Sequence, residues 1–294
     1  MTEDFTLVGI RPAAPPKPAP KIPWYHKVPP VSAAVLAVIV LGCALCGLFI
    51  PKNPSYMDLQ HCSAAPGAEF WFGTDAMGRD VFSMIWYGGR ISLFIGLFST
   101  VLSTLLGVVL GSVSGCAPRW LDAAMMRATE IFLSVPSLLL TVLLQAILGK
   151  ANVLSISLVI ALTSWTSIAK VVRTEVQQLR SSEYVLAAKA MGGSFFHILA
   201  RHLAPNFASS ILFMVVMNIR SAILAESTLS FMGLGLPLEV VSWGSMLSLA
   251  EGALLTGSWW VIVIPGAFLI VTLLCITNLA NALRAGSTWR QSNL

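Results

Sequence analysis

The chain has 294 residues, of which 56% are hydrophobic and only 11% are charged. Soluble domains carry roughly 25% charged residues, so this composition excludes an ordinary soluble globular protein. The formal net charge of +5 would suit a nucleic-acid partner only if the bases were clustered. The sequence contains no long basic run and no basic patch with interleaved aromatic residues, and we therefore expect no nucleic-acid partner.

Six stretches of roughly 20 mostly uncharged residues follow one another along the chain, and each is long enough to cross ~30 Å of hydrocarbon as a helix. Backbone groups in lipid must be satisfied within their own segment, which predicts a helix for each stretch. The fold class is therefore an all-α membrane protein with six transmembrane helices. The predicted spans are 31–51, 91–118, 131–149, 151–169, 206–225 and the C-terminal two-thirds of 252–283.

Lysine and arginine lie mainly on one side of this topology. Six spans place both termini on the same side, and bases concentrate on the cytoplasmic side of membrane proteins. Thirteen bases lie on the side of the termini: Arg11, Lys17, Lys21, Lys27, Arg119, Arg127, Lys170, Arg173, Arg180, Lys189, Arg201, Arg284 and Arg290. The other side has only four: Lys52, Arg79, Arg90 and Lys150. Both termini are therefore predicted to be cytoplasmic.

This orientation divides the chain into predicted segments. A proline-rich cytoplasmic tail at 1–30, either a linker or a docking arm, precedes the first span at 31–51, and an extracytoplasmic segment follows at 52–90. The core of five spans occupies 91–283, with a cytoplasmic loop at 173–205 and an extracytoplasmic loop at 226–255. A cytoplasmic tail at 284–294 ends the sequence.

The cytoplasmic loop has the pattern of two short helices. Ser181 and Ser182 can cap a helix that begins at Glu183, whose carboxylate suits the positive end of a helix. Gly192 and Gly193 end that helix, and Pro205 precedes the next span. Four residues share one face at helical spacing: Tyr184, Ala187, Ala188 and Met191. Such a face suits a groove on another protein, and a loop folded back on its own bundle fits the residues equally well.

Three stretches resemble the membrane subunits of bacterial ABC importers. The cytoplasmic loop is similar to the "EAA" loop of those subunits at Ala187, Ala188, Gly192 and Pro205. It departs from that pattern at Leu186, His202 and Ala204. "FGTDAMGRDVFSMIWYGGRISL" and "AILAESTLSFMGLGLPLEVVSWGSML" resemble signature stretches of the oligopeptide, dipeptide and nickel permeases, most closely the second, C-type membrane subunit of the dipeptide/oligopeptide importers. The resemblance covers roughly 70 to 283.

The resemblance implies a type I ABC importer permease fold in the bacterial cytoplasmic membrane. It implies as partners a second, homologous permease subunit, two cytoplasmic ATP-binding subunits and an extracytoplasmic solute-binding protein. The cytoplasmic loop at 173–205 would be the coupling element, with its coupling residues between Glu183 and Pro205 and with Gly192 at a turn where a side chain would clash. The sequence contains no GxxxxGK[ST] phosphate loop, so we expect ATP and Mg to be bound by the partners. We expect no catalytic residue, cofactor or metal site in this subunit.

The function that the resemblance implies is ATP-driven import of di- or oligopeptides delivered by the binding protein. Import of nickel or another metal chelate is the alternative within the same class. A membrane coupling or receptor subunit that does not transport is the alternative from a different class.

Two further sets of residues are candidates for function on the predicted outer side. Gly73, Thr74, Asp75, Gly78, Arg79 and Asp80 form either a self-contained ion-pair turn that sets the start of the second span or a contact with the delivery protein. Arg220, Glu226 and Trp243 are candidates for the translocation pathway or its gate. A charge inside a span is costly, so Arg220 should face a cavity, a partner's carboxylate or, by snorkelling, the outer surface. Trp243 suits the membrane interface with its N–H in water.

Overall fold

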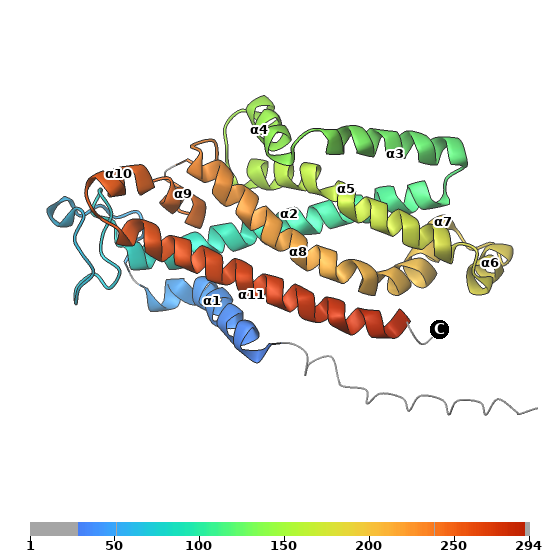
Figure 1. Cartoon of the computed structure of the whole chain (residues 1–294), viewed down its shortest axis with the longest axis horizontal. Helices are drawn as coiled ribbons and strands as arrows, with labels where there is room; N and C mark the ends of the chain where they lie inside the picture. The colour runs from blue at the N-terminus through green and yellow to red at the C-terminus, as the bar shows by residue number, and fades with distance from the viewer. Residues whose placement is uncertain (1–28, 51, 238, 292–294) are drawn as a thin grey trace, which may run out of the picture.

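The structure, a computed structural model, describes residues 29–50, 52–237 and 239–291 as an all-helical protein (Figure 1). The tail predicted at 1–30 therefore lies almost entirely outside the described residues. The long helices are α1 (Pro30–Phe49), α2 (Val81–Cys116), α3 (Arg119–Ser134), α4 (Ser137–Leu148), α5 (Val153–Leu179), α8 (Ala204–Phe231) and α11 (Trp260–Gln291). The short helices are α6 (Glu183–Ala190), α7 (Phe195–Ile198), α9 (Trp243–Leu247) and α10 (Ala250–Leu255), with a 3-10 turn at Leu59–His61 and a π-helical turn at Leu199–Leu203.

Five helices are each long and apolar enough to cross a membrane, namely α1, α2, α5, α8 and α11. The predicted third span differs, because 131–149 is not one helix. The chain bends by 93° between α3 and α4, and the described residues contain a sixth span only if this bent pair is counted as one. Pro136 lies at the bend, where it has no N–H to continue the hydrogen bonding of α3.

The helix α2 begins at Val81, earlier than the uncharged run at 91 predicts. The Asp80 side chain accepts a hydrogen bond from the Ser83 backbone N–H and so caps the first turn. Arg90 is exposed on the helix surface and does not interrupt it. The extracytoplasmic segment predicted at 52–90 therefore ends in the first turns of α2.

Helices α2 and α5 pack very closely because small residues line the contact. Gly107, Gly111 and Gly115 recur every fourth residue on one face of α2. A β-carbon at Gly107 would lie 2.8 Å from the Ile168 side chain, and one at Gly115 would lie 2.8 Å from Val176. The absence of side chains on this face of α2 lets the two backbones approach.

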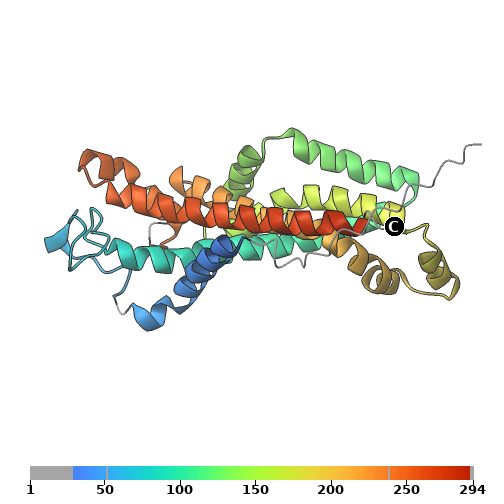
Figure 2. The same cartoon turned by 60° about the horizontal axis from the view of Figure 1, so that its bottom comes forward.

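The bundle is elongated, and its functional segments lie at opposite ends (Figures 1 and 2). Helices α6 and α7 lie at one end, called the α6 end below; α9, α10 and the segment 52–80 lie at the other, called the α9 end. Helix α3 runs along the periphery. Its first turn is held to α5, because the Asp122 carboxylate accepts bonds from the Arg173 guanidinium and, at 3.2 Å, from Gln177 Nε2.

Candidate functional site

The helix predicted at the α6 end is present at the predicted position. Helix α6 ends at Ala190, and Gly192 follows with a φ of +82°, in the left-handed region that favours glycine. The Gly193 N–H donates to the Ala188 carbonyl oxygen at 3.0 Å. This is the bond of a Schellman cap, so the Gly-Gly pair ends the helix as the sequence predicts.

The capping by Ser181 and Ser182 differs from the prediction. Their hydroxyls donate backwards, to the carbonyl oxygens of Gln178 and Leu179 in the last turn of α5. The Ser182 carbonyl oxygen accepts the backbone N–H groups of the first turn of α6. The two serines therefore join α5 to α6 instead of capping α6 with their side chains.

The predicted shared face of α6 is divided between the bundle and solvent. Val185 and Ala188 are buried in a cluster with α5, Ile198, Leu203 and α8. Met191 is 82% exposed and points away from that cluster, as Leu186 does at 52%. The side chains of Tyr184, Ala187 and Pro205 lie outside the described part of the structure. The loop therefore packs on its own bundle and leaves Leu186 and Met191 exposed, while a contact with another protein stays a prediction.

Gly192 has open space around it. A β-carbon built there meets no atom within 4 Å, whereas one at Gly193 would lie 2.8 Å from the Ala188 carbonyl oxygen. Within this chain the requirement for glycine at 192 is therefore one of backbone conformation. Among the described residues, no atom would clash with a side chain at this position.

At the α9 end, the residues from Gly73 to Asp80 form a self-contained turn. Asp75 and Arg79 are both nearly fully buried, and Asp75 Oδ2 accepts from Arg79 Nε at 2.7 Å. Asp75 Oδ1 accepts the backbone N–H groups of Met77 and Arg79 at 2.9 and 2.8 Å. Gly73 and Gly78 both have a φ of +74°, which the tight turn needs.

This turn joins three parts of the chain. Asp80 caps α2, and the Trp260 indole N–H at the start of α11 donates to the Thr74 carbonyl oxygen at 3.0 Å. The Thr74 hydroxyl accepts the Ala64 N–H at 2.8 Å and donates to the His61 carbonyl. The geometry matches the interpretation as an ion-pair turn that sets the start of the second span.

Glu226 lies at the centre of a hydroxyl cluster at the α9 end. Its side chain is fully buried and accepts hydrogen bonds from Ser242 at 2.7 Å, Ser230 at 3.0 Å and Ser92 at 3.2 Å. Each of these hydroxyls also accepts a backbone N–H. The N–H donors are Ser245 to Ser242, Leu236 to Ser230 and Trp243 to Ser92. Glu226 thus holds α2, α8 and the first turn of α9 together through three serines.

Trp243 is fully buried and not at a wet interface. Its indole N–H donates to the Ile85 carbonyl oxygen of α2 at 3.0 Å. A β-carbon at Gly89 would lie 2.7 Å from the Trp243 ring, so the glycine leaves room for it. Neither Glu226 nor Trp243 faces open space in this chain, and both instead fix the position of α9.

Arg220 lies on a partly exposed face of α8, the face that also carries exposed Ser221 and Leu224. Within the described residues its guanidinium forms no ion pair. The charge is therefore available on the surface of the single chain, where a pathway or a second subunit would meet it.

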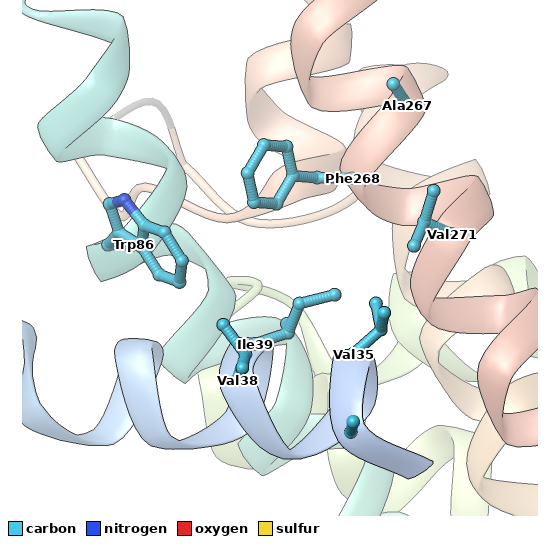
Figure 3. Close-up of a pocket in the computed structure, with 8 residues that line it drawn as sticks. Val35, Val38, Ile39, Trp86, Ala267, Phe268 and Val271 are labelled. Carbon is cyan, nitrogen blue, oxygen red and sulfur yellow. The ribbon is translucent and has the colours of Figure 1, made fainter. Parts of the chain in front are cut away.

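A groove between α1, α2 and α11 is lined by hydrocarbon (Figure 3). Its volume is about 470 Å³, and Trp86 and Phe268 meet edge to face at one side, with ring centroids 5.6 Å apart. The remaining lining residues are Ala34, Val35, Val38, Ile39, Ala267 and Val271. The groove suits apolar contents and offers no group that would bind a polar solute.

Sequence reasoning identified Glu226 but missed its partners. Ser230 lies one helical turn from it, and that spacing was a usable signal. Ser92 and Ser242 are 134 and 16 residues away, and no local pattern relates them to Glu226. Trp260, whose indole N–H holds the turn from Gly73 to Asp80 through the Thr74 carbonyl oxygen, was missed for the same reason.

Comparisons with known proteins agree with this geometry. The family model described as "Binding-protein-dependent transport system inner membrane component" matches residues 103–286. The chain is 36% identical over 242 residues to the dipeptide transport system permease protein DppC of Bacillus subtilis, covering 82% of this chain and 75% of that protein. It is also 36% identical to the oligopeptide transport system permease protein OppC of Bacillus subtilis, covering 88% and 84% of the two chains.

A solved structure shares the fold. The methionine ABC transporter MetNI, in an inward-facing conformation, superposes with a TM-score of 0.56 over 69% of this chain and 96% of its own chain, at 15% identity. The helical bundle therefore has the fold of an ABC importer permease. By the family match and by its relatives, this chain belongs to the family of binding-protein-dependent transport system inner membrane components.

Proposed function

We propose that this chain forms half of the translocation pathway of an ATP-driven importer of di- and oligopeptides. Permeases of this family work in the membrane with ATPase subunits and a binding protein. The observation that carries the peptide assignment is the similarity to DppC and OppC over more than four-fifths of the chain. The second half of the pathway would be a homologous permease subunit, and delivery would come from an extracytoplasmic solute-binding protein.

The test is uptake by proteoliposomes that contain the complete transporter and its own binding protein. With ATP inside, labelled di- and tripeptides should accumulate, and free nickel or a nickel chelate should not. Accumulation of nickel without peptide would overturn the substrate class. Binding of the ATPases without uptake of either would favour a coupling subunit that does not transport.

The coupling surface is proposed to be the solvent-exposed face of α6 and of the turn that follows it. Glu183 begins the helix, Leu186 and Met191 are exposed, and Gly192 leaves open space beside them. Ala188 faces the bundle and would transmit movement inward instead of touching the partner. ATP and Mg are proposed to lie entirely on the ATPase subunits, so that the energy of hydrolysis reaches this chain as movement of α6.

The pathway is proposed to pass the exposed face of α8 that carries Arg220. Glu226 and Trp243 would act as positioning residues that hold α9 at the outer mouth. An Arg220→Ala variant is expected to lower peptide uptake while ATPase copurification is unchanged, and Arg220→Lys should retain part of the uptake because the charge is kept. Wild-type uptake by Arg220→Ala at equal expression would remove Arg220 from the pathway.

A further inference from the structure

A second cavity, of about 490 Å³, lies beside the first half of α2 at the α9 end. Its volume is in the range of small-molecule sites. Its lining combines aromatic, apolar and charged side chains. Tyr87, Arg90 and Phe94 come from α2, Pro54 from the segment after α1, and Glu239 and Val240 from the segment before α9. The proposed function uses none of these residues.

The two charges in this cavity are not paired with each other. Among the described residues Arg90 and Glu239 appear in no ion pair, and both side chains are exposed. The closest polar contact of the Arg90 guanidinium is the Cys46 sulfur at 3.9 Å, which is longer than a strong hydrogen bond. The cavity therefore presents one free cation and one free anion, which together complement a ligand with both charges.

The cavity lies at the level of a membrane surface. Arg90 is the last charge before the uncharged run of α2, and Cys46 beside it is in the last turn of α1, with Lys52 shortly beyond. Tyr87, one turn before Arg90, donates its phenolic hydrogen bond to the Ile50 carbonyl oxygen at 3.2 Å. Tyrosine and arginine at the end of a span are typical of the zone of lipid headgroups.

An exposed apolar stripe continues from the cavity along α2. Its residues repeat every three or four positions and so share one face of the helix: Phe94, Leu97, Phe98, Val101 and Leu105. The first two aromatic rings stack, with centroids 5.6 Å apart. From Phe94 to Leu105 the helix rises about 16 Å, roughly the depth of one leaflet.

We propose that this cavity and stripe bind a zwitterionic phospholipid with a primary amine, such as phosphatidylethanolamine. Arg90 holds the phosphate, Glu239 holds the ammonium group, and an acyl chain lies along the stripe from Phe94 to Leu105. A short peptide also carries both charges, but it has no part that would cover such a stripe. If both termini are cytoplasmic, as the sequence predicts, this lipid lies in the outer leaflet. The headgroup chemistry does not depend on that orientation.

The test measures lipid retained by the complete transporter after purification from membranes and exchange into nanodiscs. Wild type should retain phosphatidylethanolamine in preference to phosphatidylglycerol. Arg90→Gln and Glu239→Gln should each lower that retention about tenfold, the loss expected for one charge-assisted hydrogen bond. Glu239→Gln should not lower the retention of phosphatidylglycerol, because that lipid has no amine for the carboxylate to hold. Lys52→Gln and Glu69→Gln remove equal charges outside the cavity and should change neither lipid.

A phosphatidylethanolamine with a photoreactive acyl chain should cross-link to α2 between Phe94 and Leu105. Unchanged retention in both Arg90→Gln and Glu239→Gln would overturn the proposal. Cross-links confined to other helices would show that a partner subunit covers the stripe, and would overturn it as well. If the two variants lower peptide uptake while lipid retention is unchanged, the cavity binds the transported peptide and not a lipid, and the proposal is wrong. Failure of peptide uptake in wild type would concern the proposed function alone.

Discussion

The fully buried Glu226 carboxylate is surrounded by hydroxyl groups. A buried charge is costly unless donors compensate it, and here Ser92, Ser230 and Ser242 donate to it while each holds a backbone N–H. Removing the Glu226 carboxylate would therefore destabilise the folded protein, because three buried serine hydroxyls would lose their hydrogen-bond acceptor.

Replacing Glu226 by alanine should lower the melting temperature of the purified transporter more than replacing it by glutamine. The amide can still accept two hydroxyl bonds, whereas alanine leaves several buried polar groups unpaired, at about 1–3 kcal/mol each. Glu69→Ala, on an exposed residue outside the lipid cavity, is the matched control and should not change the melting temperature. Equal melting temperatures for the alanine and glutamine variants would contradict the hydroxyl network.

The exposed pair of Asp58 and His61 gives a pH response at the α9 end. His61 Nδ1 lies 2.8 Å from Asp58 Oδ2, and this bond raises the pKa of His61 and lowers the pKa of Asp58. The raised pKa means that the pair stabilises the loop at low pH and loses that contribution as pH rises through the pKa of folded His61. The lowered pKa of Asp58 sets the low-pH limit of this stabilisation. As pH falls through that pKa, Asp58 becomes protonated and the contribution of the pair to stability is lost.

An NMR titration of labelled histidine should show the His61 pKa move down, toward the ordinary value of about 6.5, in Asp58→Asn. Gln60→Ala, next to the pair but without a charge, is the comparison and should leave the titration in place. An identical His61 titration in wild type and Asp58→Asn would show that the pair does not form.

At the scale of elements, the position of α9 depends on the absence of a side chain at Gly89 of α2, which leaves room for the Trp243 ring. Gly89→Leu should displace α9 and the neighbouring part of α1, because a β-carbon at 89 would lie 2.7 Å from the buried Trp243 ring and closer still to the Cys43 sulfur. We expect lower uptake and faster proteolysis between α8 and α11. Gly47→Leu, where a β-carbon has no contact shorter than 3.9 Å, is the control and should keep both near wild type. Normal uptake by Gly89→Leu would mean that α9 can move without loss of function.

The two glycines after α6 allow a conformational role to be tested separately from a contact with a partner. Gly193→Ala should disturb α6 itself, because the new β-carbon would meet the Ala188 carbonyl oxygen. Gly192→Asn should preserve the left-handed turn at low cost while adding a side chain toward the partner. Loss of ATPase copurification in Gly192→Asn, with a normal melting temperature of the permease, is the expected result. Normal copurification and uptake would show that no partner contacts this position.

The elements that the sequence predicted well are those with local signals. Charge, spacing and the Gly-Gly pair predicted a helix from Glu183 to the Gly-Gly pair, where α6 lies, and hydropathy located five of the spans. Pro136 in the sequence could have predicted the break between α3 and α4. The uncharged run at 131–149 continues through this proline, so hydropathy alone predicted one unbroken span. The start of α2 was missed because a charge at Arg90 ends an uncharged run without ending a helix. The burial of Trp243 depends on Gly89 and Ile85, which are distant in sequence, so no local rule could place it.

At the scale of the whole molecule, the orientation can be tested with a native reporter. Cys62 is exposed at the α9 end, and Met191 is exposed at the α6 end. A membrane-impermeant maleimide should label Cys62 in intact cells. Met191→Cys, in a Cys62→Ser background, should be labelled only after the membrane is opened. The reverse pattern would invert the predicted topology and the assignment of the coupling surface.

The length of α2 has a mechanical consequence. Its 36 residues make a rod of about 54 Å without an internal proline, well beyond the ~30 Å of hydrocarbon. At one end the Val81 N–H donates to the Gly73 carbonyl oxygen of the turn from Gly73 to Asp80, and at the other Arg180 Nη1 donates to the Gly115 carbonyl oxygen, both at 3.0 Å. Such a rod works as a lever, in which a tilt of about 5° at one end displaces the other by about 5 Å. A displacement at one end of α2 would therefore reach the other end at once, as a swing of the whole helix and not as a chain of local adjustments.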